Sequence, residues 1–360
     1  MKRVVTIVGA RPQFIKAAAV SRAIRADFSG RIEEVLVHTG QHYDDNMSKV
    51  FFDELDIPRP RYNLDISGGQ HGAMTGRMLE GIENVLLQEK PDWLLIYGDT
   101  NSTLAGALAA AKLHIPIAHV EAGLRSFNMR MPEEVNRILA DRVSSKLFCP
   151  TVAAVDNLKA EGICEGVHNV GDVMYDVALF YRDRARRNSS VLQNFRLKTS
   201  EFALATCHRA ENTDDPGRLK AILEALVSIA KELPVVLPLH PRTRKLIGEY
   251  GLEYQLNKLI VADPLPFLDM VALEQSARFI LTDSGGVQKE AFFYGVPCIT
   301  MREETEWVET VDLGWNQLVG ASTHSILSAV SQVLTPTVKR MAACPYGRGE
   351  AATDILTLLV

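Results

Sequence analysis

Short apolar runs alternate with longer amphipathic stretches along the whole of this 360-residue chain. In the first half, the apolar runs have the length and composition of buried strands, and they lie at residues 4–8, 34–38, 93–97, 117–120 and 147–149. Helical patterns separate them, for example at residues 13–25, 102–112 and 132–143. This alternation predicts an α/β protein in which parallel sheets carry helices on both faces.

The second half repeats this pattern after an interruption. A charged and polar stretch at residues 184–201 is interpreted as following the crossover between two domains, and a length of 360 residues also favours two domains over one. We place a first domain at residues 1–170 and a second at 171–346, and we expect the C-terminal helix, at 347–360, to pack back on the first. The strands predicted for the second half lie at residues 202–206, 235–239, 259–261, 279–282 and 297–300.

Charge and composition exclude several classes of partner. The net charge of −5 and the pI of about 6.0 argue against a nucleic acid or an anionic membrane. No run of about 18 apolar residues is free of charge, so no membrane span is expected. Gly9 and Arg11 interrupt the first apolar run too early for a signal peptide. The five scattered cysteines form no C-x-x-C pair and no H-E-x-x-H spacing occurs, which predicts a cytoplasmic protein without a metal site.

The residues that carry chemistry follow the predicted strands, and in open parallel sheets ligands bind at the carboxyl ends of strands. After an apolar run at 277–281, a polar turn leads into a helix with Gly285 and Gly286 in its first turn. Free backbone N–H groups and the positive dipole end favour a phosphate there. Glu290, about one turn later, is placed to accept hydrogen bonds from ribose hydroxyls. A strand–turn–helix unit without a ligand explains the local pattern equally well.

Two cations follow the first predicted strand. Arg11 comes after a glycine turn, where a guanidinium can pair with a diphosphate at two points. Lys16 lies one helical turn further on and adds positive charge. Solvated surface side chains remain the alternative for both residues.

Two carboxylates follow neighbouring predicted strands. Asp99 can cap the next helix, but Thr100 and the polar residues after it can also do so, which leaves Asp99 available for another role. Glu121 closes a buried strand, where a carboxylate is costly unless it is paired or used. A buried ion pair with Arg125 or Arg137 is the structural alternative for Glu121.

Further candidates occur at other element boundaries. Glu133 opens a predicted helix, where the helix dipole alone accounts for an acid, so its pattern favours a structural role. His208 and Arg209 follow the strand at 202–206, and a histidine there can titrate near neutral pH and transfer a proton. His240, with arginines nearby, has the pattern of an anion contact.

Seven motifs together resemble the non-hydrolysing UDP-N-acetylglucosamine 2-epimerase family, and they occur in the order of that family over nearly the whole chain. The motifs are G-A-R-P-Q-F-I-K (9–16), T-G-Q-H-Y-D (39–44), G-D-T-N-S-T (98–103), H-V-E-A-G-L-R (119–125), P-E-E-V-N-R (132–137), H-R-A-E-N (208–212) and D-S-G-G-V-Q-K-E (283–290). The resemblance implies a GT-B fold, with two Rossmann-like domains whose parallel sheets face a central cleft that binds UDP.

The resemblance also implies the reaction, which is C2 epimerisation of a UDP-sugar by loss and re-addition of UDP, without a cofactor, in a homodimer. The residues that match catalytic positions of the family are Asp99, Glu121, Glu133 and His208. Those that match UDP and substrate contacts are Arg11, Lys16, Arg137, Arg209, His240, Phe267, Ser284, Gly285, Gly286 and Glu290. Which acid removes the C2 proton stays open.

Departures from the usual family pattern point to a subgroup. Gln13 stands where many members have an acid, and Arg130 and Arg242 are additional arginines. Losing an acid and gaining arginines suits a more anionic sugar. With V-G-D-V-M-Y-D (170–176), these features resemble the subgroup that epimerises UDP-2,3-diacetamido-2,3-dideoxy-glucuronate for surface polysaccharide. The alternatives are an epimerase that converts UDP-N-acetylglucosamine to UDP-N-acetylmannosamine, and a non-catalytic UDP-sugar-binding protein.

Overall fold

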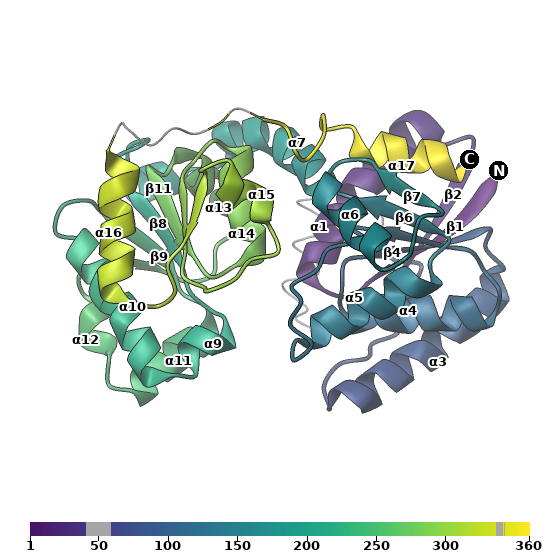
Figure 1. Cartoon of the computed structure of the whole chain (residues 1–360), viewed down its shortest axis with the longest axis horizontal. Coiled ribbons are helices and arrows are strands. Elements are labelled where there is room, and N and C mark those ends of the chain that lie inside the picture. The colour runs from purple at the N-terminus through teal and green to yellow at the C-terminus, as the bar shows by residue number, and fades with distance from the viewer. Residues whose placement is uncertain (41–58, 336–340, 342) are drawn as a thin grey trace. The chain divides into compact units, whose positions relative to one another are not determined.

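The chain forms two compact units, each built around one parallel sheet (Figure 1). This computed structural model describes residues 1–40, 59–335, 341 and 343–360. The first unit comprises Met1–Val177 together with Cys344–Val360, and the second comprises Ala178–Ala343.

The first unit contains a sheet with the strand order β3-β2-β1-β4-β5-β6-β7, in which every pairing is parallel. The strands are β1 Lys2–Val8, β2 Ile32–His38, β3 Tyr62–Asn63, β4 Trp93–Tyr97, β5 Ile117–Val120, β6 Lys146–Cys149 and β7 Val167–Asn169. The register pairs Tyr97 with Val120, so β4 and β5 end side by side. Residues that follow these two strands are therefore neighbours.

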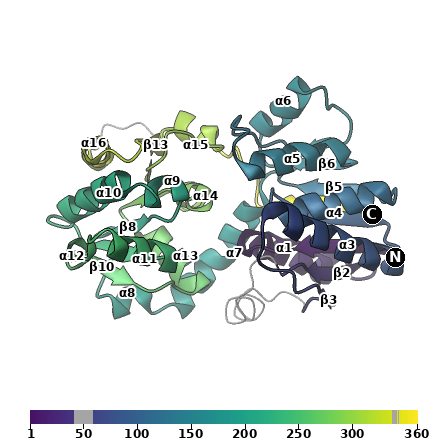
Figure 2. The same ribbon diagram turned by 90° about the horizontal axis from the view of Figure 1, so that it is seen from below.

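Helices cover both faces of this sheet, with α3, α4 and α5 on one face and α1 and α17 on the other (Figures 1 and 2). They are α1 Arg11–Ala23 with a π-helical continuation Ile24–Phe28, α3 His71–Glu89, α4 Asn101–Lys112, α5 Pro132–Val143, α6 Val152–Ala160 and α17 Ala351–Leu359. The C-terminal helix α17 packs against α1. The carboxylate of Asp176 accepts hydrogen bonds from the Ala351 and Ala352 N–H groups and so holds the start of α17.

The second unit contains a parallel sheet with the strand order β10-β9-β8-β11-β12-β13. Its strands are β8 Ala203–Thr206, β9 Val235–Pro238, β10 Ile260–Ala262, β11 Phe279–Thr282, β12 Cys298–Thr300 and β13 Asn316–Leu318. Its helices are α8 Val191–Asn194, α9 Ala210–Thr213, α10 Pro216–Ile229, α11 Pro241–Glu249, α12 Glu253–Leu256, α13 Phe267–Ser276, α14 Gly285–Phe293, α15 Val308–Asp312 and α16 Thr323–Leu334.

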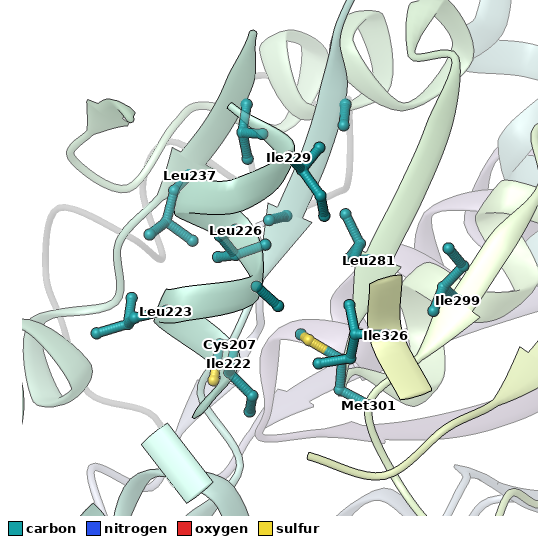
Figure 3. Close-up of a cluster of buried hydrophobic side chains, with 14 of the residues drawn as sticks. Cys207, Ile222, Leu223, Leu226, Ile229, Leu237, Leu281, Ile299, Met301 and Ile326 are labelled. Atoms are coloured by element: carbon teal, nitrogen blue, oxygen red, sulfur yellow. The ribbon is translucent and has the colours of Figure 1, made fainter. Parts of the chain in front are cut away.

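The cores follow from the apolar runs of the sequence. In the second unit, Leu281 and Ile299 from the sheet pack against Leu226 and Ile229 of α10 and Ile326 of α16 (Figure 3). In the first unit, buried valine, leucine and isoleucine residues of β1 and β4 lie in a comparable cluster with α3 and α4. Strands buried on both faces read as continuous apolar runs, which is why these strands were predictable.

The structure also corrects the sequence-based element assignment. Helix α7, Val173–Asn188, was not predicted, and it runs into the charged and polar stretch 184–201, which follows the change of unit at Val177. Three strands, β3, β7 and β13, were not predicted because they are two or three residues long and only partly buried. Within the described residues, no helix has the length and apolar character needed to cross a membrane.

Candidate active site

Glu121 forms an ion pair with Lys16 in the first unit, and both side chains are almost fully buried. In the structural alternative for Glu121 the partner was Arg125 or Arg137, whereas the ion pair that the structure shows is with Lys16 of α1. The solvated alternative for Lys16 is also wrong, because this residue is 7% exposed. Gly98 lies beside the pair, where a Cβ would approach the Glu121 carboxylate at 3.2 Å. Pairing with Lys16 explains how the Glu121 carboxylate can be buried at the end of a strand, which the sequence alone left unexplained.

Asp99 is not a helix cap. Thr100 is the N-cap of α4 and accepts a hydrogen bond from the Thr103 N–H at 3.3 Å. The Asp99 carboxylate instead pairs with Arg137 of α5, and the Asn136 side chain donates to the Asp99 carbonyl at 2.9 Å. The prediction that other residues cap α4 and leave Asp99 available is confirmed.

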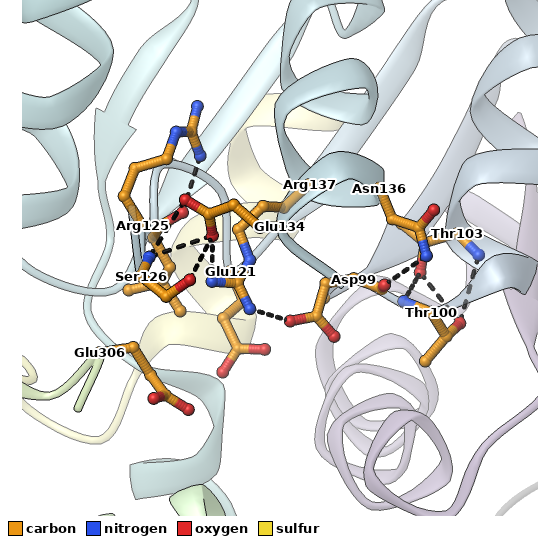
Figure 4. A network of polar contacts seen from close by, with 12 residues as sticks. Asp99, Thr100, Thr103, Glu121, Arg125, Ser126, Glu134, Asn136, Arg137 and Glu306 are labelled. Carbon is orange, nitrogen blue, oxygen red and sulfur yellow. Dashed lines mark hydrogen bonds and ion pairs between the residues drawn. The ribbon is translucent and has the colours of Figure 1, made fainter. Parts of the chain in front are cut away.

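Glu134 organises the loop at 126–131, and it was not among the predicted site residues (Figure 4). It is 1% exposed and accepts hydrogen bonds from the Ser126 and Phe127 N–H groups. It also accepts from Arg137 at 2.8 Å, so one arginine bridges Glu134 and Asp99. Glu133 is partly exposed in the first turn of α5, next to this network. The sequence signal for Glu134 was obscured because acids are expected in any first helical turn.

Arg11 is the first residue of α1 and is partly exposed at the carboxyl end of β1. Gln13, two residues later, is 1% exposed and wholly engaged within the protein. Its carbonyl accepts from the Gly9 and Ala10 N–H groups, and its amide donates to the Tyr97 carbonyl. The replacement of an acid by Gln13, which was interpreted as suiting a more anionic sugar, therefore also has a structural explanation, because the side chain caps α1 from inside.

A buried network lies directly behind the carboxylates. His119 of β5 contacts Asp141 through Nδ1 and the Gly98 carbonyl through Nε2, each at 2.7 Å. Asp141 also accepts from Arg125 at 2.7 Å, and Arg125 makes two hydrogen bonds to Glu161. Burial opposes charge on Arg125, but the two carboxylates outweigh it and raise its pKa. The one sequence signal for this network was a histidine inside an otherwise apolar strand.

Asp283 organises the corresponding sheet edge of the second unit and was also missed as a site residue. It follows β11, is fully buried, and accepts from the backbone N–H groups of His208 and Arg209 at 3.0 Å each. The Asn212 amide donates to it at 3.3 Å. Burial lowers the pKa of His208, and the positive charge of Arg209 adds to this effect while Asp283 opposes it. The neutral imidazole is therefore favoured at neutral pH.

His240 lies near His208, with 6.2 Å between the ring centroids. It is the N-cap of α11, and its Nδ1 accepts from the Arg242 N–H at 3.2 Å. The Arg242 guanidinium is already engaged, since it forms an ion pair with Asp214 and donates to Thr213 at 2.9 Å. At this edge of the sheet, the side chains of His208, His240 and the partly exposed Arg209 are therefore accessible to a ligand.

The start of α14 has the features predicted for an anion site. Ser284 is its N-cap with no side-chain capping bond, and Gly285 and Gly286 are its first two residues. A Cβ on Gly285 would lie 2.5 Å from the Glu306 carboxylate, whereas one on Gly286 would find only Ser284 Oγ, at 3.9 Å. A side chain at Gly285 would thus displace the end of the Glu306 side chain, while Gly286 leaves the backbone N–H groups open to approach. Glu290 lies on the same helix and is partly exposed.

Phe267 is a buried residue at the start of α13. The Phe267 ring is 5% exposed and packs edge-on against Tyr181 at 5.0 Å, so it offers a ligand mainly its backbone at the start of α13.

Residues 41–44 of the motif at 39–44 lie outside the described part of the chain. Among the described residues, no group of three His, Cys, Asp or Glu side chains is arranged to hold a metal ion.

Known proteins provide an independent comparison. The family described as UDP-N-acetylglucosamine 2-epimerase matches residues 24–360. UDP-2,3-diacetamido-2,3-dideoxy-D-glucuronate 2-epimerase of Pseudomonas aeruginosa is 56% identical over 99% of both chains. The crystal structure of Methanocaldococcus jannaschii UDP-N-acetylglucosamine 2-epimerase, in complex with UDP-N-acetylglucosamine and UDP, is 43% identical with a TM-score of 0.91 over 99% of both chains.

A more distant likeness concerns the fold. Phytolacca americana UGT2, solved with UDP-2fluoro-glucose and pterostilbene, is 12% identical and has a TM-score of 0.62 over 100% of this chain and 94% of its own. At that identity the likeness shows the fold alone, which confirms the predicted GT-B class of two parallel α/β sheets. From the match along nearly its whole length, the chain belongs to the UDP-N-acetylglucosamine 2-epimerase family and is a UDP-sugar 2-epimerase.

Proposed function

We propose that this enzyme inverts C2 of UDP-2,3-diacetamido-2,3-dideoxy-glucuronate, a UDP-sugar that carries its own carboxylate. The observation that carries the proposal is the 56% identity, over 99% of both chains, to the Pseudomonas aeruginosa epimerase named for that substrate. Arg130, which is exposed on the loop 126–131, supports it as a cation available to the sugar carboxylate. Gln13 and Arg242 lend no support, because both are engaged within the protein.

The proposed reaction proceeds by elimination and re-addition. A base removes the proton from C2, the C1–O bond to the diphosphate breaks, and the electron pair forms the C1=C2 bond of a glycal. UDP leaves with the C1–O electrons. Its diphosphate then re-adds at C1 while an acid protonates C2 on the opposite face. The C2 hydrogen is not next to a carbonyl, so its removal depends on stabilising the charge that develops on UDP.

In this scheme the first unit supplies the acid and base groups. Inversion requires proton removal and return on opposite faces, hence at least two groups, and we assign them among Asp99, Glu121 and Glu133. The ion pairs of Asp99 and Glu121 support a charged carboxylate at each position, which is the form that accepts a proton. Arg11 is proposed to bind the diphosphate from the start of α1.

The second unit is proposed to bind UDP. The start of α14, from Ser284 to Gly286, is assigned to the phosphates and Glu290 to the ribose hydroxyls. His208 is proposed to serve as an acid or base, and its lowered pKa favours the neutral imidazole, which is the form that accepts a proton. Arg209, His240 and the backbone at Phe267 are assigned to substrate contacts.

An NMR time course in deuterated water tests this proposal. The purified enzyme is given the diacetamido glucuronate or UDP-N-acetylglucosamine, with no metal or nicotinamide added. Deuterium should enter C2 of the recovered UDP-sugar, with a much higher kcat/KM for the glucuronate. Asp99→Asn, Glu121→Gln and Glu133→Gln should lower turnover about 10²–10⁴-fold while UDP affinity changes only a few fold. Near-normal turnover in all three would refute the residue assignment.

The second candidate is an epimerase specific for UDP-N-acetylglucosamine, which the Methanocaldococcus jannaschii structure favours. Equal turnover of the two sugars, or turnover of the neutral one alone, would establish it. A non-catalytic sugar-binding role predicts binding without any exchange at C2. Coupled detection of released UDP would identify hydrolysis instead of epimerisation.

The assembly and compartment are proposals as well. We expect a homodimer, as the family resemblance implies, and light scattering on the purified protein measures the mass directly. We also expect the protein to act in the cytoplasm. All five cysteines are free, which fits a reducing compartment.

A further inference from the structure

Both ring nitrogens of His119 face hydrogen-bond acceptors. Nδ1 lies 2.7 Å from the Asp141 carboxylate, and Nε2 lies 2.7 Å from the carbonyl oxygen of Gly98. The ring is 0% exposed, so no water replaces either partner. A carbonyl oxygen only accepts hydrogen bonds, and an ionised carboxylate likewise only accepts.

A neutral imidazole does not fit these two contacts. It carries one N–H, so one ring lone pair would point at an oxygen lone pair at 2.7 Å without a proton between them. Moving the extra proton to Asp141 does not resolve the conflict, because that carboxylate also accepts from Arg125 at 2.7 Å and from the Gly123 N–H at 3.1 Å. Although burial alone would raise it, the pKa of Asp141 is lowered, first by the hydrogen bond and charge of His119 and then by Arg125. An imidazolium satisfies every contact.

The charges around His119 balance when it is a cation. His119 and Arg125 contribute two positive charges, and Asp141 and Glu161 contribute two negative ones. The remaining titratable group near Asp141 is the Cys149 thiol, which burial keeps neutral by raising its pKa to about 12. A buried set of ions persists when it is paired and fully hydrogen-bonded in this way.

The same contacts hold the two turns that carry the proposed acid and base groups. Nε2 binds the carbonyl of Gly98, the residue before Asp99. Through Asp141, the ring is linked to the N–H of Gly123, two residues after Glu121. Glu121 has φ = 71°, which an L-residue keeps only when surrounding contacts enforce it. His119 therefore lies between both turns and contacts neither catalytic side chain.

We propose that His119 is a buried imidazolium and a positioning residue, whose two donated hydrogen bonds fix the turns of Asp99 and Glu121 for the C2 reaction. The positioning part rests on the proposed function, since it takes the roles of these two carboxylates from it. The protonation state does not depend on it, because it follows from the contacts of the ring alone.

NMR of protein labelled with ¹⁵N-histidine tests the protonation state directly. At pH 7 to 8, both ring nitrogens of His119 should carry protons that are protected from exchange, because each faces a hydrogen-bond acceptor. His168 of β7 is the internal reference, because burial and Lys146 lower its pKa and favour its neutral imidazole at this pH. His119→Gln assigns the signals, and His119→Asn replaces it for this purpose if the glutamine variant does not fold. A neutral tautomer of His119 at pH 7 to 8 overturns the proposal.

Three variants test the positioning role. His119→Gln retains one donor for two acceptors, and its kcat should fall about 10²-fold while UDP affinity stays within about threefold. Asp141→Asn can donate to Nδ1 of a neutral His119 and still accept from Arg125, so every contact survives without the charge. Its ring should become neutral by NMR, and its kcat should exceed that of His119→Gln at least tenfold. His168→Gln, the matched control on the same sheet, should retain wild-type kcat.

The outcomes separate this inference from the proposed function. If the wild-type enzyme epimerises the sugar but His119→Gln keeps a kcat within about twofold of it, the positioning role is wrong. An Asp141→Asn variant as slow as His119→Gln also overturns it. Absence of C2 exchange in the wild-type enzyme contradicts the proposed function itself. The NMR experiment then still tests the protonation state of His119, which does not depend on that function.

Discussion

The ammonium group of Lys16 and the carboxylate of Glu121 form an ion pair in which the side chains are 9% and 10% exposed. Lys16 lies on α1, whereas Glu121 follows β5, 105 residues later in the chain. The pair therefore joins two elements of the first unit at the carboxyl edge of its sheet. Its burial makes each charge depend on the other, because an unpaired ion in this position is costly.

Replacing Lys16 with methionine should destabilise the protein and slow the reaction. The change leaves the Glu121 carboxylate buried without its cation, which typically costs about 3–5 kcal/mol. The free energy of unfolding in urea measures the effect. Adding Glu121→Gln to this variant removes the negative charge of the carboxylate and should recover part of the lost free energy of unfolding. A Lys16→Met variant as stable as the wild type would show that the pair contributes nothing to folding.

Gly98→Ala should reduce activity more than its effect on the backbone explains. Gly98 has φ = 60°, and an added Cβ would lie 3.2 Å from the Glu121 carboxylate and 3.4 Å from the Lys16 ammonium group. Gly162→Ala is the matched control, because Gly162 has φ = 76° and no atom within 4 Å of the added Cβ. Both variants should lose roughly 1–2 kcal/mol of stability from the left-handed backbone. Only Gly98→Ala should also lose kcat, and equal kcat values would contradict this.

The fold was predictable where burial leaves a strong pattern. The predicted strands at 93–97, 117–120 and 279–282 coincide with β4, β5 and β11, because buried parallel strands are continuous apolar runs bounded by turns. Short edge strands such as β13 bury too few residues to produce such a run. Helix α7 was not predicted, because its charged residues conceal the helical period.

Only those contacts of the candidate site that join residues close together in the sequence could be predicted. Local capping chemistry correctly separated Asp99 from the cap of α4. It did not identify Lys16 as the partner of Glu121, because that contact depends on how α1 packs against β1 and β4. Gln13 in place of an acid was interpreted as suiting a more anionic sugar, yet its side chain closes hydrogen bonds of the protein backbone. Partners that are distant in sequence require the tertiary structure.

The stability of the first unit should depend on pH through Asp176. Burial raises the pKa of this carboxyl from 3.8 to about 6, although the N–H groups of Ala351 and Ala352 favour its ionised form. The folded state then holds the proton more tightly than the unfolded state, so the stability present below about pH 4 is lost as the pH rises to about 6. Asp176→Asn removes this loss.

Thermal and urea unfolding at several pH values check this expectation. The unfolding free energy of Asp176→Asn relative to wild type should rise by up to about 3 kcal/mol between about pH 4 and about pH 7. The substitution also removes one hydrogen-bond acceptor from the start of α17. This cost does not vary with pH, so it does not affect how the difference in unfolding free energy changes between the two pH values. Asp156→Asn, an exposed change on α6, is the control for general charge and should run parallel to wild type. A parallel profile for Asp176→Asn would exclude the linkage.

Selectivity for an anionic sugar should depend on Arg130 and not on Arg242. Arg130 is exposed on a loop whose backbone Glu134 holds, so its guanidinium is available to a carboxylate of the substrate. Arg242 is already paired with Asp214, so removing it exposes that acid without removing a substrate contact. A charged hydrogen bond is typically worth about 1.5–3 kcal/mol, which corresponds to about 10–150-fold in kcat/KM.

Arg130→Leu should therefore lower kcat/KM for UDP-2,3-diacetamido-2,3-dideoxy-glucuronate by about that factor and leave UDP-N-acetylglucosamine nearly unchanged. Arg242→Leu should change the two values by the same factor, because its contacts are within the protein. Steady-state rates with both sugars decide the matter. If Arg130→Leu slows both sugars equally, Arg130 does not bind the sugar carboxylate, and the preference for an anionic substrate then rests on the likeness to the Pseudomonas aeruginosa enzyme alone.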